Sequence, residues 1–520
     1  MGFWARALPW PYGIGTERRL SYLSFLHLSV GIDGQVFHSL EDFAWRGIDL
    51  VSRYHTKHLL SYDWSFEGLQ ISAKYSLVSE HALFCSLEIT NTSPQQKACV
   101  VHATNIYGFP ARRYWGCDGI STIYKPFEDA AFAKVWAYGD IFALGANRAS
   151  SAHKATASDE EWTQWITTGD LGSNEGALVR FSPGVFHNGF SAGLTPVHEE
   201  QLEDHVNMVM SYEVNIAPGR TEVLRLCLSR GVNEVNASAT LRHALSEGPL
   251  RAAEQLSADE DFYRRAPRLE EDWPEDWKHG WIYDLETIRM TIRPPVGIFR
   301  HPWDGMQVHT PRSVLGEMSL DTLCLSYADI DLAKKVIFGT FADAPMPNVP
   351  CTREDGSMNM ISENASECGT APNWGFGFLV IQSILARDGD LVWLRDLYPY
   401  LERFLQWWME NRADDHGWFH ADCSWESGQD GSQRFRLSGD TPGASTVDVR
   451  TVDIEASMAH AFRAMAEFAL RLEREADVRR WNELAEDRAR RVRSMYVDGW
   501  YRDFDASTGD PILIRITSTL

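Results

Sequence analysis

The stretch that organises the second half of the chain reads Trp425-Glu426-Ser427-Gly428-Gln429-Asp430-Gly431-Ser432-Gln433-Arg434-Phe435. It combines two carboxylates, one arginine and two aromatic residues, and its glycines allow the backbone to turn sharply. Because helical patterns flank it on both sides, we expect a loop held at a helix end, and such loops often carry function. The composition suits work on a sugar, in which an acid protonates the leaving oxygen while charged and aromatic groups hold the ring.

Asp430 is the candidate general acid of this loop. Its place between Trp425 and Phe435 would raise the pKa of its carboxyl by desolvation and keep it protonated near neutral pH. Glu426 is expected to hold sugar hydroxyls, and Arg434 to grip a hydroxyl or to pair with Glu426. The alternative is a loop whose acids only pair with arginines, and composition weighs the two interpretations about equally.

Apolar residues recur at helical spacing on both sides of this loop. The expected helices cover residues 315–338 with a break near Asp329, residues 376–385, residues 391–409, residues 454–472 and residues 481–495. A short hairpin is expected between Gly499 and Pro511. The pattern predicts a succession of helical hairpins joined by long loops. Such hairpins can close into a ring whose loops build a pocket at one end.

The first half of the chain shows the two-residue alternation of β-strands. Residues 83–89 alternate up to a turn at Asn91–Pro94. Residues 206–216 and 224–228 alternate on either side of Pro218-Gly219, which predicts a hairpin with one buried face. Repeated short strands with turn signals predict a large antiparallel β-sandwich.

The length of 520 residues favours two large domains. We expect an N-terminal β-sandwich domain over residues 1–236, a helical linker over residues 237–290 and a helical catalytic domain over residues 291–520. Residues 150–170 are mostly polar and are expected to form an exposed excursion of the first domain.

Charge and hydropathy restrict the partners of the chain. The net charge is 49 − 72 = −23 and no basic block occurs, so we expect neither nucleic acid nor an anionic membrane as a partner. No apolar run is long enough to span a membrane, and the N-terminus lacks a signal-peptide core, which favours a cytoplasmic location. The eight cysteines are scattered without a Cys-x-x-Cys pair, so buried free thiols are expected.

Metal and cofactor chemistry find little support in the sequence. His301 and His309 lie eight residues apart without a clear third ligand, so we expect no metal site. The fingerprints of serine hydrolases, P-loops and dinucleotide-binding folds are absent, and no cofactor is expected.

Two further positions are candidates for contact with a sugar. Asp304 follows Trp303, and an aromatic ring beside a carboxylate suits stacking combined with hydroxyl recognition. The alternative for this pair is a helix cap next to a core tryptophan. Glu363 and Glu367 lie in a polar loop that either lines the pocket or, as we favour, forms its solvated rim.

The central loop resembles the Glu-Ser-Gly-x-Asp-x-Ser-x-Arg-aromatic signature of family 63 glycoside hydrolases and the related trehalases. Val452-Asp453-Ile454-Glu455-Ala456 is similar to the Val-Asp-Leu-Asn segment that follows there, and Trp303-Asp304 resembles an earlier Trp-Asp motif. Residues 501–511 resemble an aromatic-Asp-x-Asp segment that closes a later hairpin. The match is specific in the central loop and loose elsewhere, and it covers about residues 299–511.

This resemblance implies an N-terminal β-sandwich followed by an (α/α)6 six-hairpin barrel that hydrolyses oligosaccharides with inversion. Asp430 matches the general acid, and Glu426 and Arg434 match residues that line the subsite of the cleaved sugar. With Trp425, Trp303 and Asp304 they form the expected substrate-binding set. The general-base glutamate of the family lies in a later motif that has no match before Leu520, so we expect an incomplete barrel and a base beyond this chain.

Three functional hypotheses share this pocket. The first is an inverting, exo-acting hydrolase of α-glucosidic or α-mannosidic linkages in short oligosaccharides. The second is a carbohydrate-binding protein that lacks the base. The third is an inverting phosphorylase, in which phosphate replaces the attacking water and basic side chains cluster at the pocket, although no such cluster stands out in the sequence. The sugar, the linkage and the oligomeric state stay open at this point.

Overall fold

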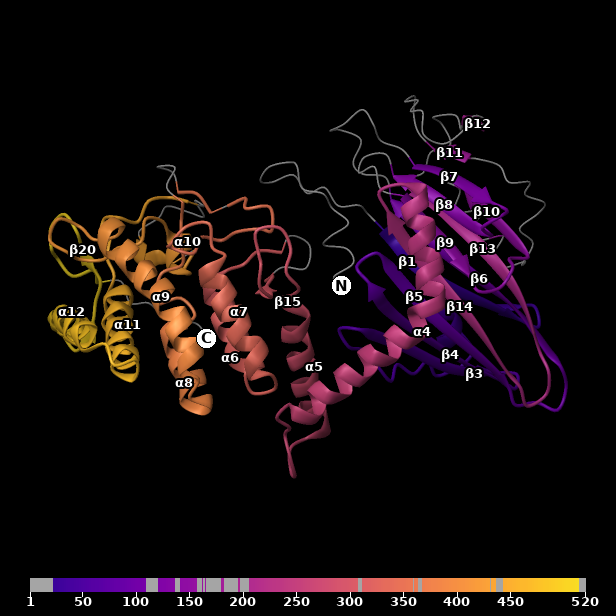
Figure 1. Cartoon of the computed structure of the whole chain (residues 1–520), viewed down its shortest axis with the longest axis horizontal. Helices are drawn as coiled ribbons and strands as arrows, with labels where there is room; N and C mark the ends of the chain where they lie inside the picture. Colours follow the sequence, from indigo (N-terminus) through magenta and orange to yellow (C-terminus); the bar gives the residue numbers. More distant parts are fainter. Residues whose placement is uncertain are drawn as a thin grey trace. The chain divides into compact units, whose positions relative to one another are not determined.

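The structure is a computed structural model. It describes residues 22–108, 120–135, 141–156, 161, 164, 179–181, 195–196, 205–306, 311–358, 360–362, 367–430, 432–435 and 443–513. The chain divides into two compact units, Met1–Asp261 and Phe262–Leu520, which we describe separately (Figure 1). The division falls inside the stretch for which we expected a helical linker.

The first unit contains two β-sheets (Figure 1). The five-stranded sheet has the order β10-β13-β6-β1-β2, with β1 Tyr22–Ile32, β2 Gln35–Phe37, β6 Lys97–Gly108, β10 Ala152–Thr156 and β13 His205–Ile216. The nine-stranded sheet has the order β12-β11-β7-β8-β9-β14-β5-β4-β3, with β3 Leu59–Phe66, β4 Leu69–Ser79, β5 Ala82–Asn91, β7 Ile120–Lys125, β8 Ala130–Val135, β9 Ile141–Ala146, β11 Val179–Phe181, β12 Thr195–Pro196 and β14 Thr221–Gly231. All neighbouring strands are antiparallel except β11 and β12.

One apolar core holds the two sheets together. Alternate residues of β6 and β13, such as Val101 and Met210, are buried against alternate residues of β5 and β14, such as Leu87 and Leu226. The period of two places one face of each strand in this core. The expected N-terminal antiparallel β-sandwich is confirmed.

The hairpin predicted around Pro218-Gly219 is wrong. The chain does turn there, and Gly219 N donates to Asn91 O at 2.9 Å, but β13 belongs to the five-stranded sheet and β14 to the nine-stranded sheet. The two strands therefore face each other through their side chains and do not share backbone hydrogen bonds. Alternation along the sequence gave the same signal for both arrangements, because each strand buries one face in either case.

Among the described residues, helix α2 lies in the first unit, and helix α4 begins there and ends just past its boundary at Asp261. Helix α2, Leu40–Trp45, begins with a capping box between Ser39 and Asp42. Helix α4, Glu234–Arg265, packs along the outer face of the nine-stranded sheet, where Gly248 lies so close to the ring of Phe84 that an added Cβ would stand 2.7 Å from it. The excursion expected over residues 150–170 is wrong in part, because residues 152–156 form β10, while most of the remainder lies outside the described residues.

The second unit is helical, as expected. Its long helices are α5 Glu275–Thr291, α6 Leu315–Leu325, α7 Ile330–Ala342, α8 Gly377–Asp388, α9 Leu391–Asn411, α11 Val452–Arg471 and α12 Glu475–Ser494. Short elements between and after them are α10 Ser424–Ser427, the 3-10 helix η2 Gln433–Phe435, and the strand pairs β15 Ile292–Arg293 with β16 Trp303–Asp304, β17 Val449–Arg450 with β20 Phe504–Asp505, and β18 Tyr496–Val497 with β19 Trp500–Tyr501.

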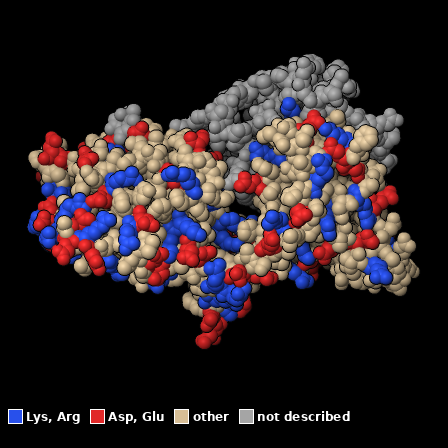
Figure 2. All heavy atoms as spheres, viewed as in Figure 1, with Lys and Arg blue, Asp and Glu red and all other residues tan. Residues whose placement is uncertain are grey.

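The helix boundaries follow from local chemistry. Asp329 caps α7 and Asp390 caps α9, each accepting a backbone N–H from the first turn, which explains the predicted breaks. The apolar face of α9, including Leu405 and Trp408, is buried in the core of this unit. On the face drawn in Figure 2, basic and acidic side chains are interspersed over both units. Among the helices of the described residues, none has an apolar stretch that could cross a membrane.

Candidate active site

The central loop is built around the one-turn helix α10. Its last residue is followed by Gly428 with φ of 73°, a left-handed conformation that favours glycine. A Cβ at this glycine would lie 2.7 Å from the indole of Trp374, so the position leaves no room for a side chain. Backbone bonds from Ala371 N to Glu426 O and from Gly428 N to Trp425 O, at 2.9 and 3.1 Å, fix the loop further.

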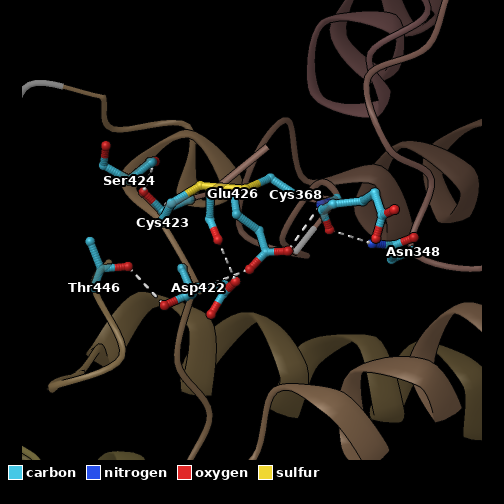
Figure 3. The surroundings of a disulfide bond; sticks show 12 residues. Asn348, Cys368, Asp422, Cys423, Ser424, Glu426 and Thr446 are labelled. Atoms are coloured by element: carbon cyan, nitrogen blue, oxygen red, sulfur yellow. Dashed lines mark hydrogen bonds between the residues drawn. A yellow bond between two sulfur atoms is a disulfide. The ribbon is translucent and has the colours of Figure 1, made fainter. Parts of the chain in front are cut away.

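Glu426, in α10, is fully buried. Figure 3 shows its carboxylate with its hydrogen-bond partners. Its Oε1 accepts from Gly369 N at 2.9 Å and from Arg412 Nη2 at 3.1 Å, and its Oε2 accepts from Asp422 N and Arg412 Nε, both at 2.7 Å. These donors occupy both carboxylate oxygens. The geometry corrects the expectation that Glu426 contacts sugar hydroxyls directly, and it also shows that Glu426 pairs with Arg412 and not with Arg434.

Arg434 is also buried and fully bonded. Its Nε and Nη2 donate to Asp503 at 2.7 and 2.6 Å, its Nη1 and Nη2 donate to Asp453 at 2.9 Å each, and Nη1 also donates to Gln429 Oε1 at 3.0 Å. Because a guanidinium has five N–H groups, none is left to grip a hydroxyl. Arg434 therefore anchors the far end of the loop to α11 and to the segment before β20, which corrects its expected role.

A disulfide links Cys368 to Cys423 beside Glu426 (Figure 3). The expectation of free thiols is wrong for these two residues. It is confirmed for the buried cysteines Cys85, Cys99, Cys227 and Cys351, whereas Cys324 is free but exposed. Cys117 lies outside the described residues. The disulfide ties the segment that donates to Glu426 to the start of α10.

Of the two tryptophans expected to contact a sugar, Trp303 and Trp425, only one is partly exposed. Trp303 is buried, its ring stacks on Phe299 with centroids 4.4 Å apart, and its Nε1 donates to Pro294 O at 3.1 Å. A ring covered in this way cannot stack on a sugar, so the expectation for Trp303 is corrected. Trp425 is partly exposed, so it remains a candidate for stacking on a sugar.

Asp304, next to Trp303, has a different environment. Only 1% of it is exposed, and its Oδ1 has no hydrogen-bond partner in the structure. Burial, followed by the negative charge of Asp321, raises the pKa of Asp304 to about 7. A carboxyl of this kind can donate or accept a hydrogen bond near neutral pH, so Asp304 remains a candidate for hydroxyl recognition.

Asp430 is exposed, two residues past Gly428. The chain itself therefore does not desolvate the carboxyl, in contrast to the expected burial between Trp425 and Phe435. Sequence reasoning missed a further carboxyl, that of Glu317 in the first turn of α6. Burial, then the nearby charges of Asp321 and Asp430, raise the pKa of Glu317. A carboxylate in a first helical turn is so common that no sequence signal separated Glu317 from an ordinary helix start.

Other predicted positions lie apart from this cluster or outside the described residues. His301 Nδ1 bonds Asp343 at 2.9 Å, while His309 and Glu363 are not among the described residues. Glu367 is partly buried, and its backbone oxygen accepts from Asn348. Within the described part of the chain, no group of three or more His, Cys, Asp or Glu residues is arranged to hold a metal ion.

Part of the second unit matches a known family. Residues 377–518 match the sequence model of the mannosylglycerate hydrolase MGH1-like glycoside hydrolase domain. This segment holds the central loop and helices α8 to α12, and the match confirms for this part of the chain the resemblance to family 63-like six-hairpin glycosidases. It connects the chain to glycoside-active enzymes. No curated protein matches the chain.

Two solved structures are among those to which the chain is similar. A bacterial glucoamylase complexed with acarbose is 8% identical, with a TM-score of 0.48 over 91% of this chain and 62% of that chain. The GH63 mannosylglycerate hydrolase from Thermus thermophilus in complex with glucose is 17% identical, with a TM-score of 0.35 over 45% of this chain and 68% of that chain. The chain thus spans less than two thirds of the glucoamylase.

Proposed function

We propose that this chain is an inverting, exo-acting glycoside hydrolase that cleaves α-glucosidic or α-mannosidic linkages of short oligosaccharides, with Asp430 as its general acid. The observation that carries the proposal is that the loop of Asp430 is anchored by two buried arginines, Arg412 through Glu426 and Arg434 through Asp503. The family match over residues 377–518 supports the class of reaction.

In this mechanism Asp430 gives its proton to the glycosidic oxygen as the bond from that oxygen to the anomeric carbon breaks. Water attacks the anomeric carbon from the opposite face and transfers its proton to a second carboxylate, so the released sugar has the inverted configuration. The loop anchors Glu426 and Arg434 would act on this step only by holding Asp430 in place. A rigid acid is effective because little reorganisation is needed at the moment of transfer.

Asp304 and Trp425 are the proposed contacts with the sugar. The unpartnered Oδ1 of Asp304 would gain a hydrogen bond from a hydroxyl, which relieves the cost of burying a polar atom. The partly exposed indole of Trp425 would cover an apolar face of the ring. Both contacts are independent of the proton transfer at Asp430, so their loss should weaken binding before it slows chemistry.

An inverting phosphorylase is the second candidate, and one observation favours it. Arg353 is buried, and burial together with the charge of Arg312 lowers the pKa of its guanidinium. Arg312 also lies beside Cys351, whose pKa responds to Glu317 as well. Arg312 and Arg353, which both affect the pKa of Cys351, provide positive charge of the kind that an attacking phosphate requires.

Sugar release from a panel of α-glucosides and α-mannosides, with and without inorganic phosphate, tests the proposal. We expect release without phosphate, a product of inverted configuration by proton NMR, and a fall of about 10²–10⁴-fold in the Asp430→Asn variant on substrates with poor leaving groups. Strict dependence on phosphate would identify the phosphorylase. Binding of sugar without any turnover would identify a binding protein, and equal activity of Asp430→Asn would refute the assignment of the acid.

A further inference from the structure

The five-stranded sheet of the first unit carries a hollow on the face that points away from its apolar core. Gly31 of β1, Val100 of β6 and Glu213 of β13 lie in register across the floor of this hollow. The residues that alternate with them, such as Val101 and Tyr212, point to the opposite face and are buried in the core. The hollow has a volume of about 370 Å³, a size that suits a small ligand.

His102 lines one end of the hollow, two residues after Val100 on the same face of β6. Only 1% of this histidine is exposed. Its Nδ1 lies 2.7 Å from Ser211 Oγ on β13, but its Nε2 is buried and has no hydrogen-bond partner among the described residues. Leaving a buried polar atom unpaired is costly, so a ligand or a water that completes it is favoured.

The chemistry of His102 Nε2 favours a hydroxyl group as its partner. Burial, followed by the neighbouring His38, lowers the pKa of His102 to about 4, so the imidazole is neutral near pH 7. The hydroxyl of Ser211 can donate to Nδ1 or accept from it, which makes Nε2 a donor in the first case and an acceptor in the second. A hydroxyl fits both states, whereas an ammonium group can only donate and a carboxylate can only accept.

The remaining lining suits a ligand that is polar at its edge and apolar on its faces. Gln35 and Asn215 contribute amides and Glu213 contributes a carboxylate, and all three are exposed. Val36 and Val100 add apolar surface between these polar groups. A sugar ring combines hydroxyls around its edge with apolar C–H faces. An anionic ligand would instead be repelled by the carboxylate of Glu213.

We propose that this hollow binds a single uncharged sugar ring, with one hydroxyl of the sugar bonded to His102 Nε2 and the apolar face of the ring against Val100. The site consists of residues of the first unit alone and contains none of the residues assigned to bond cleavage. It would therefore hold carbohydrate without cleaving it. The inference does not depend on the proposed reaction, because it would hold equally for a chain without hydrolase activity.

NMR of the histidine rings tests the site at His102 itself. The full chain, labelled with ¹⁵N in its histidine side chains, would be titrated with glucose and with mannose, and the His102 signals would be identified by their loss in His102→Phe. We expect at least one of the two sugars to shift the Nε2 signal of His102 until it saturates at millimolar concentrations. Sodium acetate serves as the charged probe and should leave this signal unchanged. Absence of a shift with both sugars, or an equal shift with acetate, would overturn the proposal.

A second variant fills the hollow and leaves His102 in place. The φ of Gly31 lies outside the left-handed region, and the nearest atom of another strand would be 3.8 Å from its Cβ, so the strand has room for a side chain there. We expect Gly31→Leu to fold and to weaken the binding of sugar seen at His102 by about tenfold or more. Gly280→Leu on α5 is the matched control, since nothing lies within 4 Å of its Cβ either, and it should bind as the parent does.

The outcomes separate this site from the proposed reaction. Thermal unfolding confirms that each variant is folded before its titration is compared with that of the parent. Unchanged binding in Gly31→Leu would overturn the assignment of the hollow. A saturable shift at His102 in a chain that releases no sugar from any substrate would support the site and refute only the hydrolase.

Discussion

Arg412 and Glu426 form a buried ion pair with two bonds, Nε to Oε2 at 2.7 Å and Nη2 to Oε1 at 3.1 Å. Both side chains are almost fully removed from solvent. A pair of this geometry orients both partners, and the loss of one partner leaves an uncompensated charge in the interior. The pair therefore holds the start of the central loop in the way that Arg434 holds its end.

The Glu426→Gln variant should destabilise the second unit strongly. Removing one partner of a buried pair costs about 3–5 kcal/mol, because Arg412 would stay buried without its counter-charge. Denaturant unfolding followed by tryptophan fluorescence measures this. Glu486→Gln breaks an exposed pair with Arg463 and should cost less than about 1 kcal/mol. Equal effects of the two variants would contradict the structural role of Glu426.

Gly428→Ala should displace the loop that carries Asp430. An added Cβ would meet the indole of Trp374 at 2.7 Å in a backbone conformation that side chains rarely adopt, so we expect a loss of about 1–3 kcal/mol and lower turnover. Gly389→Ala is the matched control, because its φ is also positive but nothing lies within 4 Å of its Cβ. Unfolding midpoints and activity that agree between the two variants would argue against the close contact at Gly428.

The first unit should lose stability in acid. Burial lowers the pKa of His27 and of His102 to about 4, below the ordinary value of 6.5, so between these values the unfolded chain binds more protons than the folded chain. Stability should fall as the pH drops from about 6.5 to 4, by up to roughly 3 kcal/mol for each histidine. Thermal unfolding of the full chain between pH 7 and pH 4.5 measures the effect.

The matched variant for this acid effect is His102→Gln, which retains a polar side chain next to Ser211 and cannot take up a proton in this range. It should be less stable than the parent at pH 7 yet lose less stability on acidification. A slope against pH identical to that of the parent would show that His102 does not contribute.

The disulfide between Cys368 and Cys423 should stabilise the second unit. It closes a loop with a sequence separation of 55, for which chain entropy predicts about 4 kcal/mol. We expect Cys368→Ala to lower the unfolding midpoint and to increase hydrogen exchange of residues 424–435. The linkage itself is checked by mass spectrometry of a non-reduced digest. A parent chain with both thiols free would contradict the bond.

Periodicity was sufficient to predict helices α6, α7, α8, α9, α11 and α12 of the second unit. The breaks at Asp329 and Asp390 are local events, since each aspartate caps the helix that follows it. In the first unit alternation predicted strands such as β5, β13 and β14 but not the partner of β14, because alternation reports which face of a strand is buried and not which strand lies beside it.

In the central loop, too, the sequence identified the residues but not the partners that decide their roles. Its sequence identified Glu426, Asp430 and Arg434 as a unit, and the structure does bring them into one loop. Burial reversed the expected roles of the two anchors, because their partners Arg412 and Asp503 lie outside the motif. Glu317 was not predicted for a related reason, since it lies far from the motif in the sequence and α6 meets Trp374 through Gly316, as the loop does through Gly428.

The crossing of the chain between sheets at Pro218-Gly219 has a consequence for how the first unit folds. Since β13 and β14 enter different sheets, neither can form a local hairpin with the other, and β13 must find β6, which places Tyr212 opposite Val101. β14 completes the nine-stranded sheet by joining β5 to β9. Such non-local pairings fold slowly. During synthesis the edges of β5 and β9 that pair with β14 must therefore stay open until β14, which ends at Gly231, has left the ribosome, and such open edges favour aggregation.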